Sequence, residues 1–318
     1  MSKRTPPRPE QFFLRCREAC ARVFGDEAGC VCPLCGRGFT EARDFTEEHV
    51  PPKSVGGAVI CVTCRECNSR AGHEVDYTLP ALARMARLGG AIFRGQGSYE
   101  GPTRVTVGGH TTNAIMAVTP RRVDLVVDPK RNDPARAQQQ LRWIEDYART
   151  GGGEIRFDTN SKFKYAHARA RVSLLRAAYL AAFALFGYTY AFDRRLNVVR
   201  AQIADPDQEI VPLAALNVTG PELAAATEPV IALLHQPFPA LAVMLPAGAS
   251  GAPFGVSVVL PALEGPSEFY EALVAQYRPG PDGRTTRIEG TPAGWPVGPQ
   301  LALDFSSAIQ AQLRQGAA

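Results

Sequence analysis

The amino-acid sequence predicts an α+β protein in which a small metal-stabilised module is followed by a larger mixed α+β domain. All eight cysteines lie in the first 67 of the 318 residues. Along the rest of the chain, short apolar runs with strand-like alternation are interspersed with runs of helical spacing. Apolar residues make up 45% of the chain and charged residues 21%, which is typical of a soluble globular protein.

Two cysteine pairs define the module. Cys32 and Cys35 form one C-x2-C pair, and Cys64 and Cys67 form another, with 28 residues between the pairs. A structural zinc ion takes four ligands in a tetrahedron, and a C-x2-C turn supplies two of them from one backbone bend. Dense pairs of this kind indicate a metal site rather than a disulfide framework. The remaining cysteines are interpreted as small core residues or spare thiols: Cys16, Cys20, Cys30 and Cys61.

The segment between the pairs carries residues suited to phosphodiester hydrolysis, which needs an activated water and a divalent cation on the phosphate. Glu48 is a hard oxygen ligand suited to Mg²⁺. His49 can be neutral at pH 7 and accept a proton. Asn68 directly follows a predicted zinc ligand and offers a carbonyl oxygen to the same cation. The alternative interpretation of His49 is an ordinary histidine in a surface loop.

The whole run of motifs resembles the HNH endonuclease family, which has the ββα-metal fold. The motifs are Cys32-x2-Cys35, Glu48-His49-x-x-Pro52, Gly56-Gly57 and Cys64-x2-Cys67-Asn68. Their form looks most like the zinc-bearing branch of that family. The resemblance implies that His49 is the general base and that Glu48 and Asn68 hold a catalytic Mg²⁺ or Mn²⁺. It also implies that the four paired cysteines hold structural zinc.

One position departs from the family pattern. The family usually carries an asparagine about five residues before the second cysteine pair, where it steadies the catalytic histidine. Val59 stands near that position here, so the orientation of His49 must come from elsewhere. His73 is a further candidate metal ligand, although a helical segment would place it about 140° around the axis from Asn68.

The charge distribution predicts where a polyanion would bind. Residues 81–200 carry a net charge of +11, residues 1–80 are neutral, and residues 201–318 carry −7. A basic stretch attracts nucleic acid, although the same side chains can simply be solvated. The residues predicted to contact nucleic acid flank the loop or lie in the basic first half of a long helix: Lys53, Arg70, Lys162, Lys164 and Arg169. Arg176 lies in the same basic half.

The other elements are predicted from periodicity and turn residues. Helices are expected at 10–24, 79–88, 134–149, 160–187 and 267–277. Strands are expected at 103–107, 114–118 and 122–127 as an antiparallel meander, then at 154–158, 229–234, 241–245 and 254–260. The glycine-rich stretch near residue 90 predicts a domain boundary. Residues 1–90 would hold a helix and the zinc module, and residues 91–318 an α+β domain with an acidic second half.

These features predict a metal-dependent endonuclease, a hydrolase that cleaves phosphodiester bonds of nucleic acid, with DNA as the expected substrate. One alternative is a zinc-stabilised nucleic-acid-binding module whose degenerate site does not cleave. Another is a zinc protein with protein partners. The N-terminus has no apolar signal core and no apolar run reaches about 18 residues, so we expect a cytoplasmic protein with no membrane partner. A homodimer, one way to cut both strands, stays open.

Overall fold

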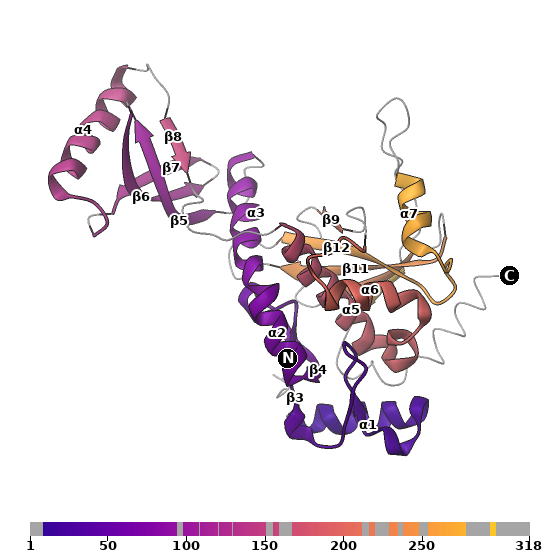
Figure 1. The fold of residues 1–318 in the computed structure, drawn as a ribbon. Helices are drawn as coiled ribbons and strands as arrows, with labels where there is room; N and C mark the ends of the chain where they lie inside the picture. Colours follow the sequence, from indigo (N-terminus) through magenta and orange to yellow (C-terminus); the bar gives the residue numbers. More distant parts are fainter. Residues whose placement is uncertain are drawn as a thin grey trace. The chain divides into compact units, whose positions relative to one another are not determined.

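The structure, a computed structural model, combines helices and antiparallel sheets (Figure 1), so the predicted α+β class is confirmed. It describes residues 9–93, 98–107, 109–119, 121–128, 130–150, 155–158, 167–211, 216–219, 229–234, 238–247, 254–277 and 293–296. These residues form two compact units. The first unit contains the described residues of 1–80 and 166–318, and the second contains those of 81–165.

The first unit begins with the cysteine-rich module. Its main elements are α1 (Pro9–Phe24), β1 (Cys30–Val31), β2 (Gly38–Phe39), β3 (Phe45–Val50), β4 (Ala58–Cys64) and α2 (Arg65–Glu74). β1 and β2 form a short antiparallel ribbon, and β3 and β4 form an antiparallel hairpin. α2 follows β4 directly, which gives the ββα order that the family resemblance implies. Phe12 and Phe13 of α1 pack with Phe45, Val62 and several cysteines in one buried cluster.

The helix α5 (His167–Ala191) is central to the first unit because it packs against α1, β3 and β4 and also against β11 and β12 of the large sheet. Tyr179 Oη donates a hydrogen bond to the Pro33 carbonyl at 2.7 Å, and Tyr188 Oη donates one to the Val31 carbonyl at 2.6 Å. Among the described residues, Ala168–Ala191 is long and apolar enough to cross a membrane, but 83% of its apolar window is buried inside the protein.

The large sheet of the first unit has the antiparallel order β13-β10-β11-β12-β9. Its strands are β9 (Leu216–Thr219), β10 (Val230–Leu234), β11 (Ala240–Ala247), β12 (Phe254–Pro261) and β13 (Ala293–Pro296). Two further helices belong to this unit, α6 (Asn197–Ala204) and α7 (Phe269–Tyr277). The strands predicted at 229–234, 241–245 and 254–260 and the helix predicted near 267–277 are therefore confirmed.

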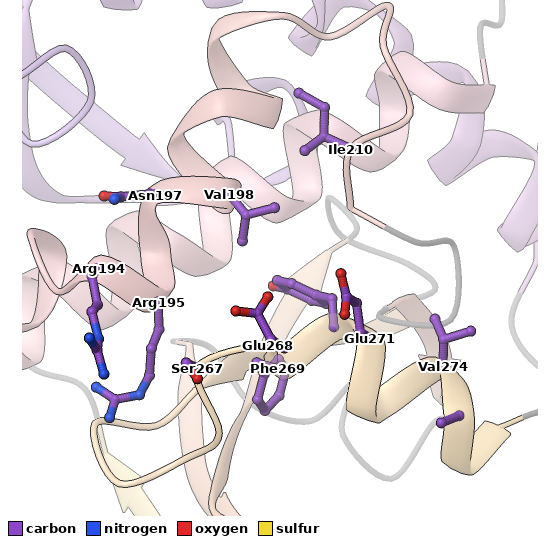
Figure 2. Close-up of a pocket in the computed structure, with 12 residues that line it drawn as sticks. Arg194, Arg195, Asn197, Val198, Ile210, Ser267, Glu268, Phe269, Glu271 and Val274 are labelled. Atoms are coloured by element: carbon purple, nitrogen blue, oxygen red, sulfur yellow. The ribbon is translucent and has the colours of Figure 1, made fainter.

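A cavity of about 730 Å³ lies in this part of the first unit, between the segment Arg194–Val198 and the start of α7 (Figure 2). Arg195 lines it, and its guanidinium is held by the Asp193 carboxylate and by the Gly265 carbonyl. No residue of the loop between the cysteine pairs lines this cavity. Periodicity alone gave no sign of it, because its walls come from segments about 70 residues apart.

The second unit is a four-stranded antiparallel sheet of order β7-β6-β5-β8 with two helices. Its elements are α3 (Leu79–Phe93), β5 (Tyr99–Val107), β6 (His110–Thr119), β7 (Arg122–Val127), α4 (Pro134–Thr150) and β8 (Ile155–Asp158). The predicted meander is confirmed. α3 continues past its predicted end at residue 88, because Ala91 packs with Tyr99 and Met116 and tertiary packing outweighs the poor helix propensity of Gly89 and Gly90.

The grouping of residues differs from the predicted division into 1–90 and 91–318. The described residues after 166 belong with the first 80, because α5 fills the core of the cysteine-rich module. The predicted ranges came from local glycine content, which carries no information about this long-range packing. The independent folding of residues 1–90 and 91–318 as separate domains stays a prediction.

Arg176 of α5 is 1% exposed, contrary to the solvent-facing position predicted for the basic half of this helix. Its Nη2 lies 2.5 Å from Glu48 Oε2, and its Nη1 lies 3.2 Å from Asp76 Oδ2. Ser173 donates a hydrogen bond to the other oxygen of Asp76. Buried charges persist when they are paired and hydrogen-bonded, and these partners lie 128 and 100 residues away in the sequence.

We predict that Arg176→Met strongly destabilises the protein, because it leaves two buried carboxylates without their cation. Breaking a buried pair by removing one partner costs about 3–5 kcal/mol. The matched control is Arg169→Met on the same helix, whose guanidinium binds the Asp207 carboxylate at the surface with distances of 2.9 and 2.8 Å. Unfolding of the zinc-loaded proteins in guanidinium chloride should show a large loss in the free energy of unfolding for Arg176→Met and little change for the control. Equal losses would contradict a special role for the buried pair.

Candidate metal centre and nuclease loop

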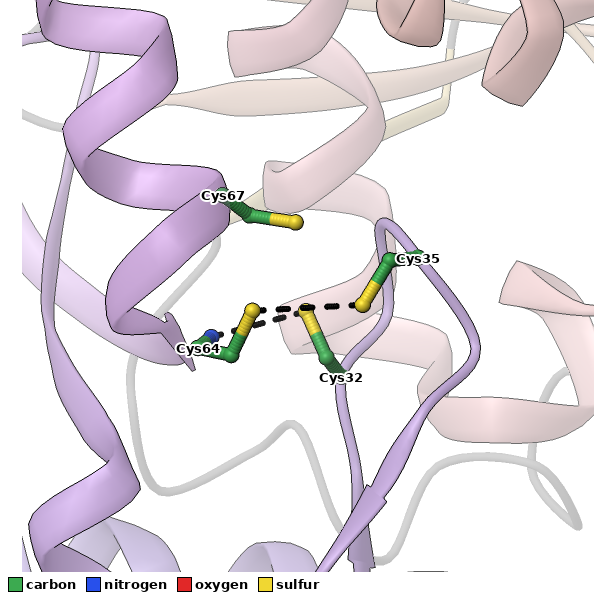
Figure 3. Close-up of side chains that lie close together, drawn as sticks. All are labelled: Cys32, Cys35, Cys64 and Cys67. Atoms are coloured by element: carbon green, nitrogen blue, oxygen red, sulfur yellow. Dashed lines mark hydrogen bonds between the residues drawn. The ribbon is translucent and has the colours of Figure 1, made fainter.

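The four paired cysteines converge at one point (Figure 3). Their Sγ atoms all lie within 4.8 Å of one another, and those of Cys35 and Cys64 are 3.9 Å apart. A tetrahedral zinc ion with Zn–S bonds of about 2.3 Å places its sulfurs about 3.8 Å apart. The arrangement of Cys32, Cys35, Cys64 and Cys67 therefore fits a metal ion.

The local fold explains how the sulfurs meet. Cys32 and Cys35 lie in the turn after β1, where the Gly36 amide donates a hydrogen bond to the Cys32 carbonyl at 2.9 Å. Cys64 is the last residue of β4, and Cys67 lies in the first turn of α2. The Cys64 amide also donates to Cys32 Sγ at 3.4 Å. The junction of β4 and α2 thus carries one half of the site.

Mutual hydrogen bonding makes some of these thiols acidic. The hydrogen bond with Cys32 lowers the pKa of Cys35 to about 4 and that of Cys64 to about 6. The pKa of Cys32 is raised, first by its hydrogen bond with Cys35. Metals bind the thiolate form, so the lowered pKa values of Cys35 and Cys64 favour metal binding at neutral pH.

The other four cysteines lie outside this group of ligands. Cys20, Cys30 and Cys61 are buried, and Cys16 is partly buried. Cys30 Sγ lies 3.6 Å from Tyr188 Oη. Within the described residues none of them belongs to a group able to hold a metal ion. Their interpretation as core thiols agrees with this placement.

His49 sits near the end of β3, beside an irregularity in the hairpin. Glu48 is paired with Cys61 and His49 with Val59, so Ile60 is an extra residue in β4. This is a β-bulge on the partner strand. Val59, at the position of the family's asparagine, therefore lies directly across from His49 and offers no side-chain hydrogen bond. Among the described residues, the imidazole has no hydrogen-bond partner.

The bulge leaves the alternation along β3 intact, because the extra residue belongs to β4. Glu47 and His49 are thus on one face of β3 and Glu48 on the other. Glu47 and His49 are partly buried, whereas Glu48 is 3% exposed. Burial lowers the pKa of His49, the Lys53 cation lowers it further, and the Glu47 carboxylate acts in the opposite direction. A neutral imidazole is favoured.

The loop after His49 turns sharply, as the glycine pair predicts. The Gly56 amide donates to the Lys53 carbonyl at 3.0 Å, and Gly56 has a positive φ of 93°. A Cβ on Gly57 would lie 1.4 Å from the Pro51 carbonyl oxygen. Only glycine fits at this close approach. The loop is held against the end of β3, which keeps Lys53 near His49.

Glu48, predicted as a ligand of the catalytic cation, points away from His49 into a buried ion-pair network. Its Oε2 accepts a hydrogen bond from Thr63 Oγ1 at 2.9 Å as well as from Arg176. Burial raises the pKa of Glu48, and the Arg176 guanidinium opposes that rise. A carboxylate already neutralised in this way does not fit a hydrated cation. Glu48 is therefore engaged in an ion pair, and its predicted role as a cation ligand with Asn68 stays a prediction.

Asn68 lies on α2 and contacts the backbone of β3. Its Nδ2 donates a hydrogen bond to the backbone carbonyl of Glu47 at 3.1 Å. In the described part of the chain, its Oδ1 has no hydrogen-bond donor. Glu47 was not among the candidate site residues predicted from the sequence. The signal that could have singled it out is period-two alternation, which places it on the same face of β3 as His49. His73 is exposed near the end of α2 and belongs to no metal-binding group of described residues.

The residues predicted to contact nucleic acid differ in their surroundings. Lys53 and Arg70 are exposed, and Arg70 makes a long contact of 3.9 Å to Glu74. Arg169 is less available, since it binds Asp207 and also donates to the Glu74 carbonyl at 3.2 Å. Lys162 and Lys164 lie outside the described residues.

We predict that Cys64→Ser removes bound zinc and unfolds the module, because three sulfurs no longer complete the tetrahedron. Structural zinc contributes about 10–16 kcal/mol of apparent binding free energy in small zinc-finger peptides. The control is Cys61→Ala, three residues earlier on the same strand and outside the cluster. Metal analysis of purified protein should show one zinc per chain in the wild type and the control, and none in Cys64→Ser. Chelation should unfold the wild type in the same way. Full zinc content in Cys64→Ser would refute this assignment.

Comparison with known proteins agrees with this geometry. Residues 32–81 match the family model described as HNH endonuclease. No curated protein and no solved structure matches the chain significantly. The match spans the metal-binding cysteines, the loop with His49, and α2 with Asn68. Residues 32–81 are therefore similar to the HNH endonuclease family, and the match covers this module of a longer chain.

Proposed function

We propose that the protein is a metal-dependent endonuclease that hydrolyses phosphodiester bonds of DNA, with His49 as the general base. The observation that carries this proposal is the placement of His49. It is partly buried on a β-hairpin whose last residue is a ligand of the four-cysteine site. The HNH family match covers the same residues.

In this proposal, zinc bound by the four cysteines has a structural role. It joins the turn after β1 to the junction of β4 and α2, and it has no open coordination position when four thiolates are bound. Asn68 directly follows the ligand Cys67, so the ion also positions Asn68. The ion thereby orders both the hairpin and the helix that flank the nuclease loop.

The proposed reaction uses the neutral imidazole of His49. It takes a proton from a water molecule whose oxygen attacks phosphorus in line, and the bond from phosphorus to the leaving 3′ oxygen breaks as the new bond forms. The leaving oxygen then takes up a proton from solvent water, and the His49 imidazolium returns its proton to solvent. A divalent cation on the scissile phosphate supplies charge stabilisation in such reactions. Exposed Lys53, close to His49, is suited to binding a neighbouring phosphate.

A second function has specific support. The Arg176–Glu48 pair and the apolar Val59 opposite His49 are both expected of a zinc-stabilised module that binds nucleic acid without cutting it. That alternative predicts strong, salt-dependent binding and intact substrate in Mg²⁺ or Mn²⁺.

We predict that His49→Ala lowers plasmid cleavage by about 10²–10⁴-fold, the usual contribution of general acid–base catalysis. The measurement is the conversion of supercoiled plasmid by zinc-loaded protein in Mg²⁺ and in Mn²⁺. His73→Ala is the control, because His73 is an exposed histidine of the same module. It should cleave like the wild type. Equal cleavage by wild type and His49→Ala would rule out this base, and an uncut plasmid with the wild type would support the binding module.

We also predict that Lys53 and Arg70 contribute phosphate contacts. Each lost contact reduces the slope of log K against log salt by about 0.9 on duplex DNA. The double variant Lys53→Ala/Arg70→Ala should therefore lower the magnitude of the slope by about 1.8. Fluorescence anisotropy with a labelled duplex measures this slope, with Lys53→Arg/Arg70→Lys as the charge-retaining control. An unchanged slope in the alanine variant would mean that both side chains are only solvated.

A further inference from the structure

We propose that Glu47, rather than Glu48, is the carboxylate that holds the catalytic divalent cation together with Asn68. This inference concerns the cation site of the proposed nuclease. The catalytic role of the cation rests on the proposed function. The cation site itself can be measured without cleavage, so the two claims can fail separately.

The first step of the argument is that Glu48 is committed elsewhere. Its carboxylate is 3% exposed and lies 2.5 Å from the guanidinium of Arg176, which is itself buried. Moving it to a cation would leave Arg176 with Asp76 alone and would break a buried ion pair, a strongly unfavourable change. Mg²⁺ dehydrates reluctantly and usually keeps several waters, and a site enclosed to this degree has no room for them.

The second step is that Glu47 is available on the face that carries His49. Strand alternation puts both side chains on that face, and the Glu47 carboxylate is close enough to affect the imidazole electrostatically. Glu47 is partly exposed and forms no salt bridge within the described residues. An unpaired carboxylate next to the proposed base can accept a hydrated cation without losing a partner.

The third step is the orientation of Asn68. Its amide nitrogen is used by the backbone carbonyl of Glu47 at 3.1 Å. This hydrogen bond holds the Asn68 side chain beside the backbone of Glu47, and within the described residues its Oδ1 has no hydrogen-bond donor. A carboxylate oxygen from β3 and an amide oxygen from α2 are hard ligands, and Mg²⁺ or Mn²⁺ in phosphate-processing sites commonly takes one or two protein ligands, with waters and substrate phosphate in the remaining positions.

The two neighbouring glutamates thus have different roles that follow from the two faces of one strand. Glu48 anchors one face of β3 to α5 through Arg176. Glu47 lies on the opposite face, which it shares with His49. The family resemblance assigns the cation to the residue directly before the histidine, and the structure assigns it one residue earlier.

The test compares two adjacent isosteric substitutions, Glu47→Gln and Glu48→Gln, in the zinc-loaded full chain. Mn²⁺ alone is the probe, and its binding is measured by electron paramagnetic resonance and by calorimetry without nucleic acid. Glu47→Gln should weaken Mn²⁺ binding by about tenfold or more and leave zinc content and unfolding unchanged, in line with the loss of a metal-site group. Glu48→Gln should lower stability and keep Mn²⁺ affinity within about twofold of the wild type, because a structural partner does not touch the ion.

Two further variants keep the result decisive. If Glu48→Gln does not fold, Glu48→Gln/Arg176→Met removes both partners of the ion pair and should retain Mn²⁺ binding. Asn68→Asp adds a charge at the second ligand and should tighten Mn²⁺ binding. The proposal is overturned if Mn²⁺ binding is lost in a folded Glu48 variant but kept in Glu47→Gln, if all variants bind like the wild type, or if the wild type binds no Mn²⁺.

Plasmid cleavage separates this inference from the proposed function. A wild type that binds Mn²⁺ through Glu47 but leaves plasmid intact would refute the nuclease and retain the site. A wild type that cleaves, with Glu47→Gln matching it in both cleavage and Mn²⁺ binding, would refute the site and retain the nuclease.

Discussion

The buried guanidinium of Arg176 ties α5 to the HNH module. It meets the Glu48 carboxylate of β3 and the Asp76 carboxylate after α2, at 2.5 and 3.2 Å. A lone cation or a lone carboxylate is costly at this depth, so the three groups require one another. The family match ends at residue 81, but the module's core does not end there. Its polar centre and several of its hydrogen bonds depend on a helix that begins at residue 167.

Local features were predictable from the sequence, and long-range pairing was not. The C-x2-C spacings predict the four-cysteine cluster, because each turn positions two sulfurs by itself. The meander of the second unit follows from alternation and turn residues. The commitment of Glu48 to Arg176 could not be predicted, since the partners are separated by 128 residues and an arginine in a basic run has the composition of an exposed face. The continuation of α3 through Gly89 and Gly90 depends likewise on tertiary contacts.

The candidate site shows the same contrast between predictable local features and unpredictable long-range packing. His49, Lys53 and Asn68 are placed by short-range features: the end of a strand, a glycine turn, and the residue after a metal ligand. The choice between Glu47 and Glu48 depends on which face of β3 meets α5. Period-two alternation shows that the two side chains point in opposite directions, but only the packed structure shows which of the two carboxylates is buried. Adjacent acidic residues in a motif are therefore not interchangeable in role.

These constraints also explain how His49 can be oriented although Val59 offers it no hydrogen bond. Cys64 pairs with Phe45 at the start of the hairpin, so a metal ion on the cysteines fixes the register at that end. Arg176 holds β3 at Glu48, directly before His49. The Gly57 turn closes the chain against Pro51, two residues after His49. A backbone held at three points limits the conformations of the side chain that it carries. The strand itself therefore sets the position of His49. An apolar residue opposite the proposed base is compatible with the proposed catalysis when the backbone supplies the rigidity that an asparagine would otherwise give.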